Sequence, residues 1–235
     1  MSGDKTFPKA FFLTGTDTDV GKTVVSAVLS LGLSAHYWKP VQSGQPKDSD
    51  FMEAAGLPRE MIFPERYCFS QPLSPHLAAR IDSQSIELSD FSLPDLAEVK
   101  HLVVEGAGGL LVPLNERDKV IDLIKSLALP VVLVARSALG TINHTLLSLE
   151  ALRKRDIDVF GVIMTGLPNR ENRLAIERFG DVAVLAEIPI LPDFKAETLA
   201  RCFADCFDKG VRRHADSSTK DLASVYADAN SRPGA

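Results

Sequence analysis

The chain has 235 residues, 45% of them hydrophobic, which is enough for a substantial core within a single α/β domain. Its formal net charge of −5 argues against a nucleic-acid partner, because nucleic-acid-binding surfaces are rich in Lys and Arg. The first residues lack the apolar core of a signal peptide, no apolar run is long enough to cross a membrane, and the three cysteines suit reduced thiols. We therefore expect a cytoplasmic protein with no membrane partner.

Apolar strand-like runs alternate with helical patterns along most of the chain. Runs rich in Val, Ile and Leu predict strands over residues 9–14, 36–40, 100–105, 131–135, 159–165 and 182–188. Helices are expected over residues 21–34, 49–55, 93–98, 119–127, 141–155, 170–179 and 195–207. This alternation predicts an α/β fold with a doubly wound, mostly parallel sheet and helices on both faces. We expect one domain over residues 1–213 and a mobile polar tail over residues 214–235.

Residues 15–23, Gly-Thr-Asp-Thr-Asp-Val-Gly-Lys-Thr, join the first expected strand to the first expected helix. A glycine loop that ends in Gly-Lys-Thr between a strand and a helix is typical of a phosphate-binding P-loop. Lys22 is expected to reach the β- and γ-phosphates, and Thr23 to bind Mg²⁺. Five residues separate Gly15 from Gly21, one more than in the standard pattern. We predict a nucleoside triphosphate site in a fold of the P-loop NTPase type.

Several residues that could carry chemistry follow the carboxyl ends of expected strands, and ligands of open α/β sheets bind at that edge. We therefore expect them to meet the P-loop at one rim. They are Lys39, Ser43, Glu105, Arg136, Ser137, Thr165 and Pro189.

Glu105 has the position of a second Mg²⁺ ligand, and the glycines after it allow backbone to approach phosphate, although a glycine turn with an incidental glutamate is the alternative. Lys39 would add positive charge where a phosphoryl group is transferred, although a solvated lysine is an equal alternative. Asp48 and Asp50 lie in a polar loop and would either supply a further metal carboxylate or simply be solvated. The helix start at residues 140–143 has free N–H groups that can bind an anion, and an ordinary capped helix is the alternative.

Five motifs together resemble the dethiobiotin synthetase family. The motifs match the family in their order and roughly in their spacing, over about residues 11–192. The five motifs are residues 15–23, Lys39-Pro-Val-Gln-Ser-Gly44, Ser74-Pro-His-Leu77, Glu105-Gly-Ala-Gly-Gly109 and Leu139-Gly-Thr-Ile-Asn-His144. The resemblance implies a homodimeric ligase of biotin synthesis that uses Mg²⁺ and ATP. Such an enzyme converts 7,8-diaminopelargonate and CO₂ into dethiobiotin, through an N-carbamate and a carbamic–phosphoric anhydride.

The resemblance also implies roles for single residues. Lys22 and Lys39 would be catalytic, because they can neutralise charge as carbamate and phosphate meet. Metal ligands would be Thr23, Asp50 and Glu105. The nucleotide would be bound by Asp19, Val20, Gly21, Lys22, Thr23, Val24, Asp50, Glu105, Gly106, Ala107, Gly108, Thr165, Gly166, Pro189, Ile190 and Leu191. The substrate would be bound by Thr18, Ser43 and, across a homodimer interface, Gly140, Thr141, Ile142 and Asn143.

One departure from the family concerns the nucleotide base. Family members that read adenine carry an Asn-Asp pair where this chain has Thr165 and Gly166. Threonine cannot reproduce the paired donor and acceptor of an asparagine amide. Base selectivity is therefore predicted to be relaxed, or shifted towards another nucleotide such as CTP.

An alternative function is a P-loop switch ATPase of the chromosome-partition or septum-placement type, which shares the doubly wound fold. Those proteins carry a signature lysine early in the loop, in a Lys-Gly-Gly-x-Gly-Lys-Thr pattern. Here residues 17–19, Asp-Thr-Asp, occupy that stretch.

Overall fold

The computed structural model describes residues 7–207, so the prediction of a mobile tail over residues 214–235 lies outside the described part. Its strands are β1 (Ala10–Gly15), β2 (His36–Trp38), β3 (Val41–Ser43), β4 (Ile62–Phe63), β5 (Tyr67–Phe69), β6 (Leu102–Gly109), β7 (Val131–Arg136), β8 (Val159–Thr165) and β9 (Val184–Ile188). Its helices are α1 (Lys22–Leu33), α2 (Asp48–Ala54), α3 (Pro75–Ile81), α4 (Val120–Leu127), α5 (Thr141–Arg153), α6 (Arg170–Gly180) and α7 (Ala196–Phe207). Two short 3₁₀ turns cover Arg59–Met61 and Leu88–Asp90.

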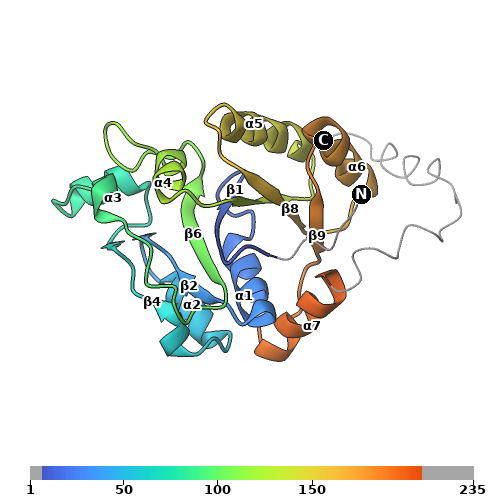
Figure 1. Cartoon of the computed structure of the whole chain (residues 1–235), viewed down its shortest axis with the longest axis horizontal. Helices are drawn as coiled ribbons and strands as arrows, with labels where there is room; N and C mark the ends of the chain where they lie inside the picture. Colours follow the sequence, from blue (N-terminus) through green and yellow to red (C-terminus); the bar gives the residue numbers. More distant parts are fainter. Residues whose placement is uncertain (1–6, 208–235) are drawn as a thin grey trace, which may run out of the picture.

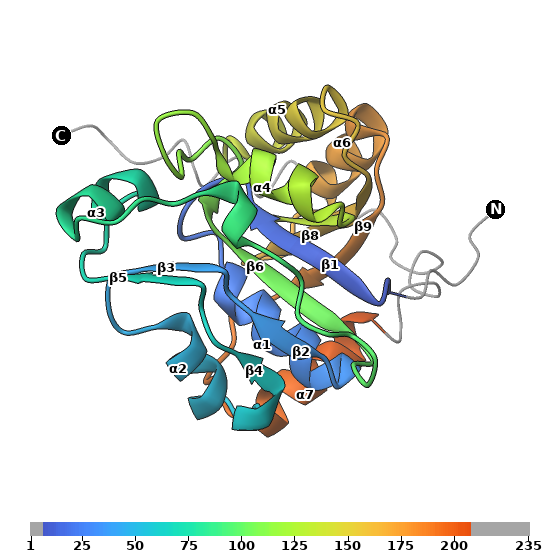
Figure 2. The same ribbon diagram turned by 60° about the vertical axis from the view of Figure 1, so that its left-hand side comes forward.

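The larger sheet has the order β4-β2-β6-β1-β7-β8-β9, and all of its pairings are parallel. Helices α1, α2 and α7 lie on one face of this sheet, and α4, α5 and α6 lie on the other (Figures 1 and 2). Along β1, Phe11 and Leu13 pack on the α1 side, while Ala10 and Phe12 pack into the opposite core. The predicted doubly wound α/β fold is confirmed.

Most of the expected elements are present, but residues 93–98 do not form the predicted helix. Six residues make fewer than two helical turns, and a helix so short has little stability of its own. There the side chain of Asp95 accepts a hydrogen bond from the backbone N–H of Ala97 at 2.9 Å, while Leu93 and Leu96 pack against the core. Helix α3 and the small sheet of β3 and β5, which were not predicted, contribute Ala78 and Tyr67 to the same core.

The sheet brings the P-loop and Glu105 to one rim. Strand β1 ends in the P-loop, and Leu13 of β1 lies opposite Glu105 of β6 in the parallel register. Gly15 allows the loop to fold back tightly, because a Cβ there would lie 2.6 Å from Val20 Cγ2 and 2.8 Å from the Asp17 carbonyl oxygen. Gly21 then caps the start of α1 with a φ of +86°, in the left-handed region that glycine favours.

Within residues 7–207, no helix combines the length and apolar character that crossing a bilayer requires.

Candidate active site

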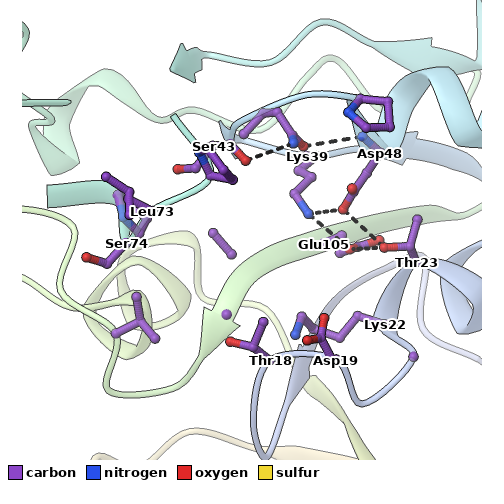
Figure 3. Close-up of a pocket in the computed structure, with 18 of the residues that line it drawn as sticks. Thr18, Asp19, Lys22, Thr23, Lys39, Ser43, Asp48, Leu73, Ser74 and Glu105 are labelled. Carbon is purple, nitrogen blue, oxygen red and sulfur yellow. Dashed lines mark hydrogen bonds and ion pairs between the residues drawn. The ribbon is translucent and has the colours of Figure 1, made fainter. Parts of the chain in front are cut away.

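A cavity of about 830 Å³ opens beside the P-loop (Figure 3). Its walls come from the P-loop and the start of α1, from the segment between β2 and α2, from the segment before α3, and from the end of β6. That volume is within the range of ligand sites for small molecules. The predicted site residues that line it are Thr18, Asp19, Gly21, Lys22, Thr23, Val24, Lys39, Ser43, Glu105, Ala107 and Gly108.

The lining also includes residues outside the predicted binding set, among them Asp48, which was considered only as a possible metal carboxylate. Ser74 and Pro75 belong to a motif that carried the family resemblance, so a signal for them existed. The same holds for Gln42, which lies in the motif over residues 39–44, whereas nothing in the sequence pattern singled out Leu73 or Val112. The residues added to the cavity wall are Gln42, Pro46, Asp48, Pro72, Leu73, Ser74, Pro75 and Val112.

Four polar side chains meet at the inner end of this cavity (Figure 3). Thr23 Oγ1 lies 3.1 Å from both Asp48 Oδ2 and Glu105 Oε1. Lys39 Nζ contacts the same two oxygens: it forms an ion pair with Asp48 and lies 3.1 Å from Glu105 Oε1. One hydroxyl and two carboxylate oxygens in one place match the hard oxygen ligands that Mg²⁺ prefers. The donor set therefore fits a magnesium ion.

The placement of Asp50 in this cluster was wrong, because Asp48 takes that position. Asp50 is exposed, and its Oδ2 accepts a hydrogen bond from the Lys47 backbone N–H at 3.3 Å. Helix α2 begins at Asp48, one residue earlier than expected. Residues two apart on a helix are rotated by about 200° around its axis, so their side chains lie on nearly opposite sides. Only one of these two aspartates can therefore face Thr23 and Glu105.

Two lysines line the cavity in different electrostatic surroundings. Burial lowers the pKa of Lys22, and the attraction of Glu105 does not offset this effect. Burial also disfavours the charge of Lys39, but Glu105 and Asp48 outweigh it and hold the pKa of Lys39 above its ordinary value. The Lys39 ammonium therefore keeps its charge in a buried position, which is the arrangement that electrostatic stabilisation of an anionic reaction centre requires.

The remaining residues predicted to bind the nucleotide lie outside this cavity. Thr165 Oγ1 donates a hydrogen bond to the Val20 carbonyl oxygen at 2.8 Å, so the end of β8 supports the P-loop backbone. The backbone N–H of Gly166 donates to the Ile188 carbonyl oxygen at 2.9 Å. Residues 189–191 follow directly after β9, and Ile190 is exposed. These residues therefore form a separate part of the rim, next to the P-loop.

Two further predicted nucleotide residues have structural positions. The Val20 side chain is buried, and its carbonyl oxygen accepts the hydrogen bond from Thr165. Gly106 packs against Phe12, because a Cβ at Gly106 would lie 2.7 Å from Phe12 Cε1.

The helix start at residues 140–143 also lies outside the 830 Å³ cavity. Gly140 caps α5 with a φ of +92°, and the preceding Leu139 is fully exposed. A second cavity of about 480 Å³ lies between α5 and the P-loop, where His144 and Leu147 face Thr18 and Leu111. The single chain thus does not bring residues 140–143 to the same cavity as Lys39.

Comparisons with known proteins agree with this architecture. A family model described as an AAA domain matches residues 9–198. The chain is 52% identical over 193 residues to the ATP-dependent dethiobiotin synthetase BioD of Paramagnetospirillum magneticum, covering 82% of this chain and 93% of that protein. It is 48% identical over 201 residues to the protein of that name from Agrobacterium fabrum, covering 84% and 94%. The chain is also 51% identical over 196 residues (82% of its length) to the biotin biosynthesis bifunctional protein BioCD of Bordetella avium, of which it spans 42%.

Solved structures share the fold at low identity. A ParA family ATPase from Chlorobium tepidum aligns with a TM-score of 0.51 and 12% identity, covering 83% of this chain and 98% of that one. A chain of the MinC:MinD cell division complex of Aquifex aeolicus gives a TM-score of 0.51 and 11% identity, covering 91% and 98%. These likenesses show the fold alone, so the switch-ATPase alternative rests on no more than a shared scaffold. The identity to dethiobiotin synthetases extends over most of the chain, and the chain belongs to the ATP-dependent dethiobiotin synthetase family.

Proposed function

We propose that this chain converts 7,8-diaminopelargonate, CO₂ and ATP into dethiobiotin, ADP and phosphate. The observation that carries the proposal is the convergence of Lys22, Lys39, Thr23, Asp48 and Glu105 on one cavity. A nucleotide anchored on the P-loop would direct its terminal phosphate to this end of the cavity. The same space would then hold the amine end of the diamine beside the phosphate.

The two lysines have a direct use in such a reaction. In the family scheme, CO₂ adds to one amine to give a carbamate, and the carbamate attacks the γ-phosphate and displaces ADP to form a carbamic–phosphoric anhydride. The second amine then attacks the carbonyl carbon, closes the ring and releases phosphate. Carbamate and phosphate are both anionic, so their approach is opposed by charge repulsion. Lys22 and Lys39 would reduce that repulsion and hold the two groups close together.

Magnesium would be held by Thr23, Asp48 and Glu105, where it would neutralise part of the phosphate charge. Lys39 now contacts the same carboxylate oxygens. Because the lysine side chain is flexible, the Lys39 ammonium can turn from these oxygens towards the carbamate. The ammonium is already charged in the buried site before the substrate binds.

The substrate carboxylate provides the argument for a homodimer. Residues 140–143 are proposed to receive this carboxylate at the start of α5, although they lie outside the cavity of the same chain. A second copy would bring its own α5 to the cavity, and the exposed side chains of Leu139, Leu147 and Leu111 offer apolar surface for the contact. We further propose that the enzyme works in the cytoplasm, where its thiols stay reduced.

Relaxed choice of nucleotide is the first testable prediction. The Thr165 hydroxyl already donates to the P-loop, and the Gly166 N–H is taken by Ile188, which leaves few groups there to read a base edge. We expect kcat/KM for ATP to exceed that for CTP, GTP or UTP by less than about a hundredfold, or roughly 2.7 kcal/mol. Steady-state kinetics with the four nucleotides measure this ratio. A larger preference for ATP would contradict the prediction.

Phosphate release tests the reaction itself. The assay contains the diamine, bicarbonate, Mg²⁺ and nucleotide, and each component is omitted in turn. Release that needs both the diamine and bicarbonate would support the ligase. Release that continues without the diamine would support a switch ATPase instead.

A further inference from the structure

Glu105 uses its two carboxylate oxygens in different directions. Oε1 faces the cavity, where Thr23 and Lys39 lie 3.1 Å away (Figure 3). Oε2 faces the protein core, where it accepts a hydrogen bond of 2.6 Å from Ser26 Oγ and one of 3.1 Å from the Tyr37 hydroxyl. Glu105, Ser26 and Tyr37 are all fully buried. One oxygen is therefore available to a ligand, and the other is fixed by the protein.

The two hydroxyls reach Glu105 from elements that already build the site. Ser26 follows Thr23 by three residues on α1, so both side chains lie on one face of that helix. Tyr37 precedes Lys39 by two residues, and side chains two apart along an extended strand share a face. Strand β2 also pairs directly with β6, which carries Glu105. The same helix and strand thus supply both the cavity side and the core side of the carboxylate.

We propose that Ser26 and Tyr37 are positioning residues that hold Glu105 Oε2 in the core and so direct Oε1 to the magnesium ion. The proposal rests on the proposed function, in which Glu105 is a metal ligand. A glutamate carboxylate rotates about its last side-chain bond, and hydrogen bonds from two donors to one oxygen restrict this rotation. Groups that orient metal ligands in this way typically change metal affinity or activity by about 10- to 100-fold when they are removed.

A purely structural role is the competing explanation. A buried carboxylate needs hydrogen-bond donors whether or not it ever binds a metal, and a buried phenol likewise needs a partner. If the role is only structural, removing either hydroxyl would lower the thermal stability of the metal-free protein. It would not change the increase in nucleotide affinity that the metal causes. The test must therefore measure the effect of the metal separately from folding and from turnover.

The variants to compare are Ser26→Ala and Tyr37→Phe, each with a matched control. Ser30→Ala removes a hydroxyl one turn further along α1, where Ser30 is fully buried and its Oγ has no hydrogen-bond partner within residues 7–207. Tyr67→Phe removes a phenol hydroxyl that bonds to Asp90 instead. Ser26→Thr serves as the conservative variant, because it keeps a hydroxyl. Calorimetric titration gives the affinity for a non-hydrolysable ATP analogue with Mg²⁺ and with EDTA, and thermal unfolding gives Tm.

The measured quantity is the ratio of the analogue affinity with Mg²⁺ to the analogue affinity with EDTA. In Ser26→Ala and in Tyr37→Phe this ratio is expected to be at least about tenfold lower than in the wild type. Affinity in EDTA should stay unchanged, as should both affinities of the Ser30→Ala and Tyr67→Phe controls. Ser26→Thr should retain most of the wild-type response. In the phosphate-release assay, the two test variants should need more Mg²⁺ for half-maximal turnover and recover most of kcat when Mg²⁺ is saturating.

An unchanged Mg²⁺ response with a lower Tm would overturn the proposal, and so would an equal loss in the controls. If one test variant does not fold, the other decides. No Mg²⁺ response in the wild-type protein would remove the metal site and this proposal together. Because the binding measurement contains no diamine, a wild type that responds to Mg²⁺ but fails the phosphate-release assay would contradict only the proposed reaction.

Discussion

Replacing Lys39 with alanine is expected to lower kcat by about 100- to 1,000-fold, which is the usual cost of removing one preorganised charge-stabilising donor. The Lys39 ammonium is buried, ion-paired to Asp48 and 3.1 Å from Glu105 Oε1, so it lies where the transferred phosphate would meet the carbamate. Lys22 and the P-loop backbone remain in the variant. Nucleotide affinity is therefore expected to survive, and calorimetric titration beside steady-state kinetics would separate the two effects.

Lys47 provides a matched control for Lys39. It precedes α2 and pairs with Glu65 at 3.4 Å, and it does not line the cavity. Lys47→Ala should leave kcat within about twofold of the wild type, because substitutions away from the site rarely exceed about 0.5 kcal/mol. Near-normal turnover of Lys39→Ala would reject a catalytic Lys39. An equal loss in both variants would point to general disturbance of the segment between β2 and α2.

The sequence predicted the rim because parallel strands place their carboxyl ends together. Lys39 and Glu105 follow different strands, and β2 and β6 proved to be neighbours. Lys39 therefore contacts Glu105, which also bonds Thr23. The glycine loop and its Gly-Lys-Thr ending carried enough local information to predict the turn and the helix start. These features depend on the order of elements along the chain and on local backbone geometry, and both can be recognised from the sequence pattern.

Other features depend on contacts that the sequence does not express. Whether Asp48 or Asp50 faces the cavity depends on the residue at which α2 begins. A pattern along the sequence places a helix end only to within about two to four residues. The strands β3 and β5 have three residues each, and α3 has seven, so their hydrophobic patterns are too short to read. The Tyr37 hydroxyl bonds Glu105 inside the core, which no spacing along the chain could indicate.

Replacing Asp48 with asparagine is expected to raise the Mg²⁺ concentration for half-maximal turnover by at least tenfold. Groups that only orient a metal ligand change affinity by about 10- to 100-fold, and a direct ligand should cost no less. Asparagine keeps the shape of the side chain and removes the charge that attracts both the metal and Lys39. The measurement is a Mg²⁺ titration of phosphate release at saturating diamine and nucleotide.

Asp50→Asn is the matched control, since it removes the same charge two residues away. Asp50 is exposed and bonds only the start of α2 in the contacts described, through the Lys47 N–H at 3.3 Å. Its loss should cost at most about 1 kcal/mol of stability and leave the Mg²⁺ titration unchanged. The opposite pattern, with Asp50→Asn shifting the titration and Asp48→Asn leaving it in place, would return the metal ligand to Asp50. That result would mean that α2 begins later when the metal binds, because the two carboxylates cannot face Thr23 together on one regular helix.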